Sequence, residues 1–267
     1  MSKKIAIIGG GNLGTSIAEG LISSKFSKPG DITITRRNIN LLESLRKKGV
    51  IVTSNNNDAV KKSEVIILAV KPFQVKEVLD GIKKDLSTGK HVVVSVITGV
   101  YIDDINGIIK KAIPVFRAMP NTAIAIKESM TCLSASKIAS ASQVEYIKSL
   151  FETIGKVVSI DEKLMDAATV LGACGTAYAM RYIRANIQGG IEIGFDAVTA
   201  ALIAAQTVKG AAELLLQKGT HPEQEIDKVT TPKGCTIAGL NEMEHQGFSS
   251  SLIKGIAISF EKIGKSS

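Results

Sequence analysis

The stretch IAIIGGGNLGTSIAEGL, residues 5–21, joins a short apolar run to a glycine-rich turn and then to an amphipathic segment. Residues 4–8 are typical of a short buried strand, since the run is apolar and ends in glycine. Apolar residues then recur at Leu13, Ile17 and Leu21, which is the spacing of one face of a helix. The stretch therefore predicts a strand, a tight turn and a helix.

The glycines Gly9, Gly11 and Gly14 have the spacing G-x-G-x-x-G. In a dinucleotide site the first permits the tight turn, the second lets a pyrophosphate approach the backbone, and the third lets the helix pack on the strand. The pyrophosphate is then expected on the N–H groups at the helix start, around Asn12 and Leu13. We interpret the motif as a dinucleotide site because of this context; a glycine-rich structural turn is the alternative.

The alternation of strand and helix continues through the first half of the chain. Short strands are expected at 31–36, 50–53, 64–70, 91–96, 112–119 and 156–160, and helices at 38–48, 56–62, 73–84, 103–111 and 142–153. Strands joined by helices imply parallel pairing with right-handed crossovers. The fold class is therefore α/β, with an N-terminal Rossmann doubly wound sheet.

The pattern changes after Asp161, where long Ala-rich segments at 164–189, 196–217, 236–243 and 250–263 predict helices. We expect a Rossmann domain at 1–160 and an all-α domain at 161–267. Asp196 is a plausible N-cap, and Gly219 is well placed to end the same helix. That helix is apolar around much of its circumference and must be covered. Self-association through the helical domain, as a homodimer, is therefore predicted.

Composition restricts the classes of partner. The chain has 267 residues and a net charge of +8, but its lysines occur as isolated pairs and its aromatic content is 4%. Nucleic-acid binding is not expected without a continuous basic tract and stacking aromatics. The apolar stretches at 91–102 and 167–180 are shorter than the roughly 20 residues that span a bilayer, so no membrane crossing is predicted. Disorder is expected at 265–267. A cytoplasmic protein is predicted, because glycines, Asn12 and Glu19 interrupt the N-terminal apolar region that could otherwise imitate a signal peptide. Three cysteines without paired C-x-x-C spacing and three scattered histidines suggest neither disulfides nor a metal site.

The end of the second predicted strand indicates which dinucleotide binds. An NAD site would place an acidic residue there for the ribose hydroxyl groups, whereas this chain has T-R-R-N, and Asp31 lies at the start of the strand. Arg36 and Arg37 offer guanidinium groups suited to a 2′-phosphate, so NADPH is the predicted cofactor. NADH stays open as an alternative, as does the interpretation that both arginines only solvate a turn.

Further motifs make the chain resemble the pyrroline-5-carboxylate reductase family. They are LAVKP (68–72), FRAMPNT (116–122), TVLGACGTAYAM (169–180), AAQTVKGAAELL (204–215) and TTPKGCTIAGLNEME (230–244). The resemblance implies a Rossmann domain and a helical dimerisation domain, with the active site between them at the dimer interface. It also implies NAD(P)H-dependent reduction of L-1-pyrroline-5-carboxylate to L-proline, the last step of proline biosynthesis.

The resemblance also implies roles for individual residues. Gly9 to Gly14 would hold the pyrophosphate, and Asn56 would lie near the adenosine ribose. The nicotinamide half would lie beside Ala69, Val70, Lys71 and Pro72, in a pocket lined by Met119, Pro120 and Asn121. The substrate-binding residues would be Gly234, Cys235 and Thr236, which hold the carboxylate, and Thr236 would be catalytic, with its hydroxyl near the ring nitrogen.

The residues themselves agree with this substrate site but depart from the family pattern nearby. Gly234, Cys235 and Thr236 follow a Pro-x-Gly turn and open a predicted helix, so their N–H groups can face a carboxylate. A protonated imine is already electrophilic, so no dedicated acid is needed. The departures are Cys174 and Thr176 in GACGTAY, and a lysine within PKG at 232–234. They leave substrate identity and turnover open.

Two other functions remain as alternatives. A β-hydroxyacid-type dehydrogenase shares the two-domain plan but uses a helix lysine as its acid and base, whereas TAYAMRYIRANIQGG offers Arg181 and Arg184. Arginine cannot exchange a proton at neutral pH. A cofactor-binding regulatory protein without turnover is the second alternative.

Overall fold

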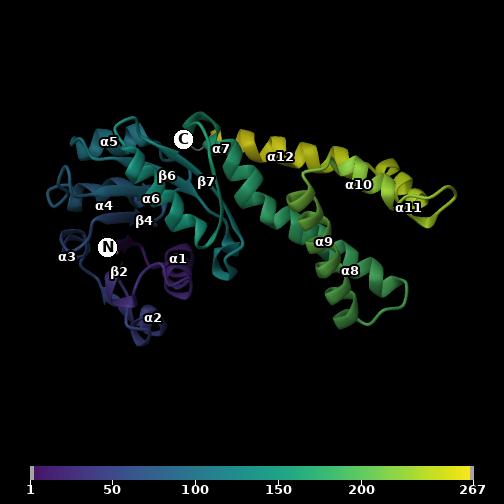
Figure 1. Cartoon of the computed structure of the whole chain (residues 1–267), viewed down its shortest axis with the longest axis horizontal. Helices are drawn as coiled ribbons and strands as arrows, with labels where there is room; N and C mark the ends of the chain where they lie inside the picture. Colours follow the sequence, from purple (N-terminus) through teal and green to yellow (C-terminus); the bar gives the residue numbers. More distant parts are fainter. Residues whose placement is uncertain (1–2, 265–267) are drawn as a thin grey trace. The chain divides into compact units, whose positions relative to one another are not determined.

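The computed structural model describes residues 3–264 (Figure 1), and the predicted disordered end at 265–267 lies outside them. The chain forms two compact units. One runs to Ala173 and also takes in the end of the last helix from Phe260, and the other is Cys174–Ser259. The boundary predicted between residues 160 and 161 stays a prediction.

The first unit is built on one sheet with the strand order β3-β2-β1-β4-β5-β6-β7-β8. The strands are β1 (Ile5–Ile8), β2 (Ile32–Thr35), β3 (Ile51–Thr53), β4 (Val65–Leu68), β5 (Val92–Ser95), β6 (Val115–Met119), β7 (Ser129–Ala135) and β8 (Gly155–Ser159). Neighbours pair in parallel except β6 and β7, which are antiparallel. The order reverses between β1 and β4, which is where doubly wound sheets bind ligands.

Helices cover both faces of this sheet. One layer holds α1 (Asn12–Ser23), α2 (Glu43–Lys47) and α6 (Ala141–Glu152), and the other holds α3 (Asn56–Lys61), α4 (Val75–Ile82) and α5 (Ile102–Ile109). Side chains of β1 alternate between the layers, so Ile5 and Ile7 enter the first core while Ala6 and Ile8 enter the second. This two-sided burial explains why the central parallel strands β1 and β4 are apolar throughout.

The sequence-based prediction was wrong about the far edge of the sheet. It expected parallel strands throughout and no strand at 129–135, where β7 lies antiparallel to β6. SMTCLSA is rich in small polar residues, which hide a strand from hydrophobic pattern, yet most of β7 is buried. An antiparallel partner needs no crossover helix, and only the short η4 (Thr122–Ile126) separates the two strands.

Several predicted helices are shorter or interrupted. The segment at 38–48 begins as η2 (Ile39–Leu42), and the one at 73–84 follows η3 (Pro72–Gln74). The segment predicted at 164–189 divides into η5 (Glu162–Leu164), α7 (Met165–Ala168), a π-helix at Thr169–Cys174 and α8 (Gly175–Glu192). Such π turns are concentrated at functional sites.

The second unit is helical. Its elements are α8, α9 (Ala197–Lys218), α10 (Pro222–Lys228), α11 (Cys235–His245) and most of α12 (Phe248–Gly264); α10 was not predicted. The predicted caps of α9 are confirmed, since the Asp196 side chain accepts from two backbone N–H groups and Gly219 ends the helix at φ +64°. A Cβ on Gly190 would lie 3.2 Å from that of Ala200, so α8 and α9 pack closely.

The helical unit leaves much apolar surface exposed. Its buried apolar side chains, within the described residues, are Ala200 and Ala204, whereas Val198 is 80% and Leu202 70% exposed. By length and composition alone, α9 is apolar enough to cross a membrane, and it is the one such helix among residues 3–264. A helix of this kind needs a covering partner.

Candidate cofactor site and the family of the chain

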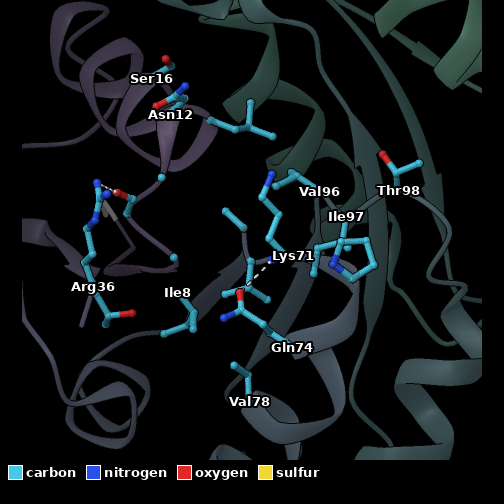
Figure 2. A pocket seen from close by; sticks show the side chains of 18 of the residues that line it. Ile8, Asn12, Ser16, Arg36, Lys71, Gln74, Val78, Val96, Ile97 and Thr98 are labelled. Atoms are coloured by element: carbon cyan, nitrogen blue, oxygen red, sulfur yellow. Dashed lines mark hydrogen bonds between the residues drawn. The ribbon is translucent and has the colours of Figure 1, made fainter. Parts of the chain in front are cut away.

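A cavity of about 920 Å³ opens at the carboxyl ends of the central strands (Figure 2). It lies at the reversal of strand order between β1 and β4, and its size suits a cofactor-sized ligand. The predicted cofactor residues line this cavity, with the exception of Gly14. Residues from the turn after β1, the end of β2 and the loop after β4 are thereby brought together.

The glycines form a cradle in which Gly9 and Gly14 have no room for side chains and Gly11 faces open space. Gly9 has φ +115°, and a Cβ there would lie 2.4 Å from the carbonyl oxygen of Ala69. A Cβ on Gly14 would lie 2.1 Å from the carbonyl oxygen of Gly9, which explains why Gly14 packs the helix on the turn instead of lining the cavity. A Cβ on Gly11 would meet nothing within 4 Å, so this position faces open space. The residues present therefore fit a dinucleotide pyrophosphate.

The start of α1 adds a positive potential to the cradle. Its N-cap is Gly11, no side chain caps the helix, and no acidic residue lies in its first turn. Uncapped N–H groups and the helix dipole both attract an anion. Asn12 and Leu13 line the cavity at this point, as predicted from the sequence.

Two arginines lie at one end of the cavity. Arg36 donates through Nη1 to the carbonyl oxygen of Gly10 at 2.7 Å, which fixes its side chain beside the glycine turn. Arg37 is exposed and also lines the cavity, and Asn56 at the start of α3 lies on the same wall. The charged residues of the lining are Arg36, Arg37 and Lys71, all cationic.

The other end of the cavity is formed by the loops after β4, β5 and β6. Ala69 to Pro72 and Met119 to Asn121 line it, together with Ile97 and Thr98 (Figure 2). Asn121 is held on both sides, since its Oδ1 accepts from the N–H of Ala123 at 3.0 Å and its Nδ2 donates to the carbonyl oxygen of Gly172 at 3.2 Å. No Asp, Glu, His, Cys or Tyr belongs to the described lining, so Lys71 is the one ionisable side chain on this wall that could donate a proton.

The predicted substrate residues Gly234, Cys235 and Thr236 belong to the helical unit, at the start of α11. They follow a turn closed by the Gly234 N–H and the Thr231 carbonyl oxygen at 2.9 Å. Lys233 in this turn has φ +60°, the left-handed conformation that glycine adopts at little cost. Lys233 therefore introduces backbone strain into this turn.

Sequence reasoning missed several residues of the lining. Thr35 ends β2, Ser54 follows β3, and 96–98 follow β5, so all lie at carboxyl ends of parallel strands. The rule that ligands bind outside these ends could have found them. Ala173 carries no such signal, because its place depends on the π-helix.

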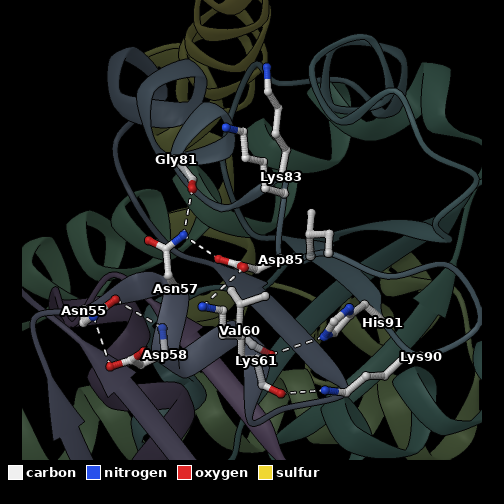
Figure 3. A network of polar contacts seen from close by, with 12 residues as sticks. Asn55, Asn57, Asp58, Val60, Lys61, Gly81, Lys83, Asp85, Lys90 and His91 are labelled. Atoms are coloured by element: carbon white, nitrogen blue, oxygen red, sulfur yellow. Dashed lines mark hydrogen bonds and ion pairs between the residues drawn. The ribbon is translucent and has the colours of Figure 1, made fainter.

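A separate polar network joins α3, α4 and the loop before β5 (Figure 3). Asn57 donates to Asp85 at 2.6 Å, and this hydrogen bond together with Lys61 lowers the pKa of Asp85. His91 is buried; its Nδ1 accepts from the N–H of Ser87 at 2.7 Å, and its Nε2 lies 3.2 Å from the carbonyl oxygen of Val60. Burial lowers the pKa of His91. These contacts connect backbone segments and are structural.

The doubly wound sheet and the glycine-lined cavity are those of an NAD(P)-dependent oxidoreductase with an attached helical domain, and the family models agree. The family model described as NADP oxidoreductase, coenzyme F420-dependent, matches residues 4–99, and the model for pyrroline-5-carboxylate reductase dimerisation matches residues 162–265. Among the described residues no group of three or more His, Cys, Asp or Glu side chains could hold a metal ion.

Individual relatives agree with the family models. Pyrroline-5-carboxylate reductase 2 of Dictyostelium discoideum is 44% identical over 99% of this chain and 93% of its own length. Reductase 1 of the same organism is 48% identical over 97% of this chain, which spans about half, 49%, of that relative. A pyrroline-5-carboxylate reductase structure from Coxiella burnetii has a TM-score of 0.91 and 30% identity, over 99% of this chain and 98% of that one. The chain belongs to the pyrroline-5-carboxylate reductase family.

Proposed function

We propose that this chain reduces L-1-pyrroline-5-carboxylate to L-proline with NADPH, the last step of proline biosynthesis. The observation that carries the proposal is a cofactor cavity whose charged side chains are all cationic, in a chain of this family. An acid is unnecessary for a protonated imine, whose carbon accepts a hydride directly. NADPH, when bound, supplies that hydride.

The residues of the cavity bind and orient the cofactor. Gly9, Gly11 and the start of α1 hold the pyrophosphate, while Arg36 and Arg37 take the 2′-phosphate through charge-assisted hydrogen bonds. Asn56 lies at the adenosine ribose. The walls at 69–72 and 119–121 hold the nicotinamide half, and their largely apolar surface excludes water.

Gly234, Cys235 and Thr236 hold the substrate. Their N–H groups at the start of α11 face the carboxylate, because no side chain caps this helix. The Thr236 hydroxyl hydrogen bonds at the ring nitrogen and orients the imine. Holding both reactants in one orientation replaces an encounter in solution and is the main catalytic contribution of the chain.

A second copy of the chain covers the exposed apolar side chains of the helical domain, 161–267. This assignment is supported by the dimerisation family match and by the exposure of Leu202 and Val198 on α9. The Rossmann domain then comprises 1–160. The three cysteines are free thiols, which suits a cytoplasmic location. Neither a nucleic acid nor a membrane is a partner in this proposal.

The test measures NADPH oxidation with synthetic pyrroline-5-carboxylate and identifies proline as the product. Thr236→Ala should lower kcat/KM for the imine while NADPH affinity stays unchanged, and Thr236→Ser should retain most of the activity. Arg36→Ala/Arg37→Ala should lower kcat/KM for NADPH and spare that for NADH. Full activity of Thr236→Ala would refute the role of its hydroxyl, and an unchanged cofactor ratio would remove the arginines from the site.

A further inference from the structure

Arg117, in the middle of β6, is a buried charged residue that has no part in the cofactor binding, substrate binding or hydride transfer proposed for this chain. Its side chain is 1% exposed and lies on the same face of the sheet as Met119, because side chains alternate along a strand. A guanidinium keeps its proton at neutral pH, so this charge must be matched inside the protein.

The matching groups come from the segment that follows the sheet. Glu162 Oε1 accepts from Nη1 of Arg117 at 3.3 Å, and Asp166 Oδ1 lies 3.6 Å from Nη2. Glu162 belongs to η5 and Asp166 to α7. The ring of Tyr101 lies against the guanidinium, with its centroid 4.6 Å from the Cζ atom. One cation is thus shared by two carboxylates and an aromatic face.

The same carboxylates also hold the start of α5. The N–H of Ile102 donates to Glu162 Oε1 at 2.7 Å, and the hydroxyl of Tyr101 donates to Asp166. The hydrogen bond to Asp166 raises the pKa of Tyr101, so the hydroxyl stays a donor. We call Tyr101, Arg117, Glu162 and Asp166 the Arg117 cluster. It joins β6, the start of α5 and the η5–α7 segment.

The Arg117 cluster fixes one end of a segment whose other end reaches the cofactor cavity. The π-helix at 169–174 follows α7 without a break, and its residue Ala173 lines the cavity. Met165 of α7 packs with Met119, and Asn121 donates to the carbonyl oxygen of Gly172. Residues 162–174 are therefore tied to FRAMPNT twice, near their start by Arg117 and near their end by Asn121.

We propose that Arg117 is a positioning residue, which holds the α7–π segment so that Ala173 and the Met119–Asn121 wall close on the nicotinamide half of the cofactor. The assignment rests on the proposed function. Arg117 is too deeply buried to touch cofactor or substrate itself, so it acts through Met119 and the π-helix. The guanidinium places Nη1 and Nη2 towards carboxylates from two elements in a fixed planar arrangement, which the compact ammonium of lysine does not reproduce.

The experiment compares Arg117→Lys with Arg46→Lys. Arg46 makes the same type of ion pair, 3.5 Å from Glu43, but on the exposed surface of α2. Fluorescence titration gives the concentration of NADPH-binding sites. The kcat for pyrroline-5-carboxylate is then calculated per binding site, and KM is measured in the same assays. Arg117→Lys should lower kcat and kcat/KM together by roughly 10- to 100-fold, the cost of a displaced wall, with Kd for NADPH unchanged. Arg46→Lys should match the wild type.

Tyr101→Phe provides a second variant that keeps the ring on Arg117 and removes only the hydroxyl. It should fold and bind NADPH with the wild-type Kd. Its kcat should fall as in Arg117→Lys, but by a smaller factor. If both variants keep the wild-type kcat per NADPH-binding site and lose only Tm, the cluster is structural and the assignment is overturned. If Arg117→Lys does not fold, Tyr101→Phe alone decides. A wild-type protein that binds NADPH without reducing the imine refutes the proposed function and this assignment with it.

Discussion

The α/β unit and the helical unit differ in how completely they bury their apolar side chains. In the α/β unit two clusters fill both sides of the sheet, and whole strands such as β1 and β4 are buried. In the helical unit the long helix α9 buries Ala200 and Ala204 and exposes Leu202, Leu216 and Val198. The α/β unit therefore has a closed core, whereas the helical unit leaves most of its large apolar side chains exposed.

This difference shows that the two halves of the chain achieve stability in different ways. The α/β unit gains its stability within one chain, by burying apolar area on both faces of a sheet. If a second copy covers the helical unit as proposed, its stability should depend on protein concentration. The cofactor cradle lies in the self-sufficient unit, and the residues proposed to hold substrate lie in the dependent one. Cofactor binding should therefore survive dissociation, and turnover should not.

The largest effect is expected from Leu202→Asp on α9. Each copy loses the burial of a leucine, about 1.5–3 kcal/mol, and gains a carboxylate at the interface, so a symmetric dimer loses twice that amount. Sedimentation should show dissociation at micromolar concentration, with NADPH still bound and turnover lost. Ile138→Asp changes a side chain on the α/β unit that is 55% exposed, and it should remain a dimer. If Leu202→Asp remains a dimer, the exposed face of α9 is not the dimer interface.

Gly14→Ala should destabilise the α/β unit. Its Cβ would lie 2.1 Å from the carbonyl oxygen of Gly9, so α1 must shift from β1, at about 1–3 kcal/mol for an overpacked site. Denaturation should show reduced stability, and calorimetry should show weaker NADPH binding. Gly11→Ala is the matched variant, because its Cβ meets nothing within 4 Å. It should keep wild-type stability and lose only affinity, and equal stability of both variants would refute the cradle geometry.

His91 should make the stability of the α/β unit fall at acidic pH. Its pKa is lowered by burial in the folded state, so below the ordinary histidine pKa of about 6.5 the unfolded chain binds the extra proton first. Stability is then fully present above pH 6.5 and falls as the pH drops towards the folded-state pKa. His91→Gln should flatten this slope in Tm measurements from pH 7 to 5, whereas His245→Gln on the exposed face of α11 should not. An unchanged slope for His91→Gln would remove His91 from this account.

The smallest effect is expected from Lys233→Gly. Lys233 has φ +60°, where a side chain is strained, so glycine should raise stability by up to about 1 kcal/mol. Lys110→Gly is the matched variant in the α/β unit, since Lys110 ends α5 at φ +51°. Denaturant titration should show similar gains at both positions. A loss of stability in Lys233→Gly would show that the lysine side chain contributes more than its backbone strain costs.

Patterns that depend on local sequence were predictable. The G-x-G-x-x-G turn, the apolar strands β1, β4 and β5, and both caps of α9 follow from residue spacing and backbone preferences alone. β7 was missed because its burial comes from tertiary neighbours and not from an apolar pattern in SMTCLSA. The π-helix at 169–174 has no sequence signature either, since it depends on contacts at both its ends.

The cofactor residues were predictable to the extent that they carry a motif. Gly9, Gly11, Arg36 and Arg37 were found from their types and their places after strands, and all four line the cavity. The Arg117 cluster was not, because FRAMPNT says nothing of the carboxylates 45 or more residues later that surround its arginine. Contacts between residues so far apart in the sequence are seen only in the folded structure.

The central claim is that a cofactor held by one unit reduces an imine held by the other unit of an assembled protein. The most direct test mixes enzyme-bound NADPH with pyrroline-5-carboxylate in a single turnover and follows NADPH absorbance and proline together. We predict that wild type oxidises one NADPH to NADP+ and reduces one pyrroline-5-carboxylate to proline per active site, and that monomeric Leu202→Asp binds NADPH but forms no proline. Bound NADPH that persists in the assembled wild type, or full conversion by the monomer, would contradict the account.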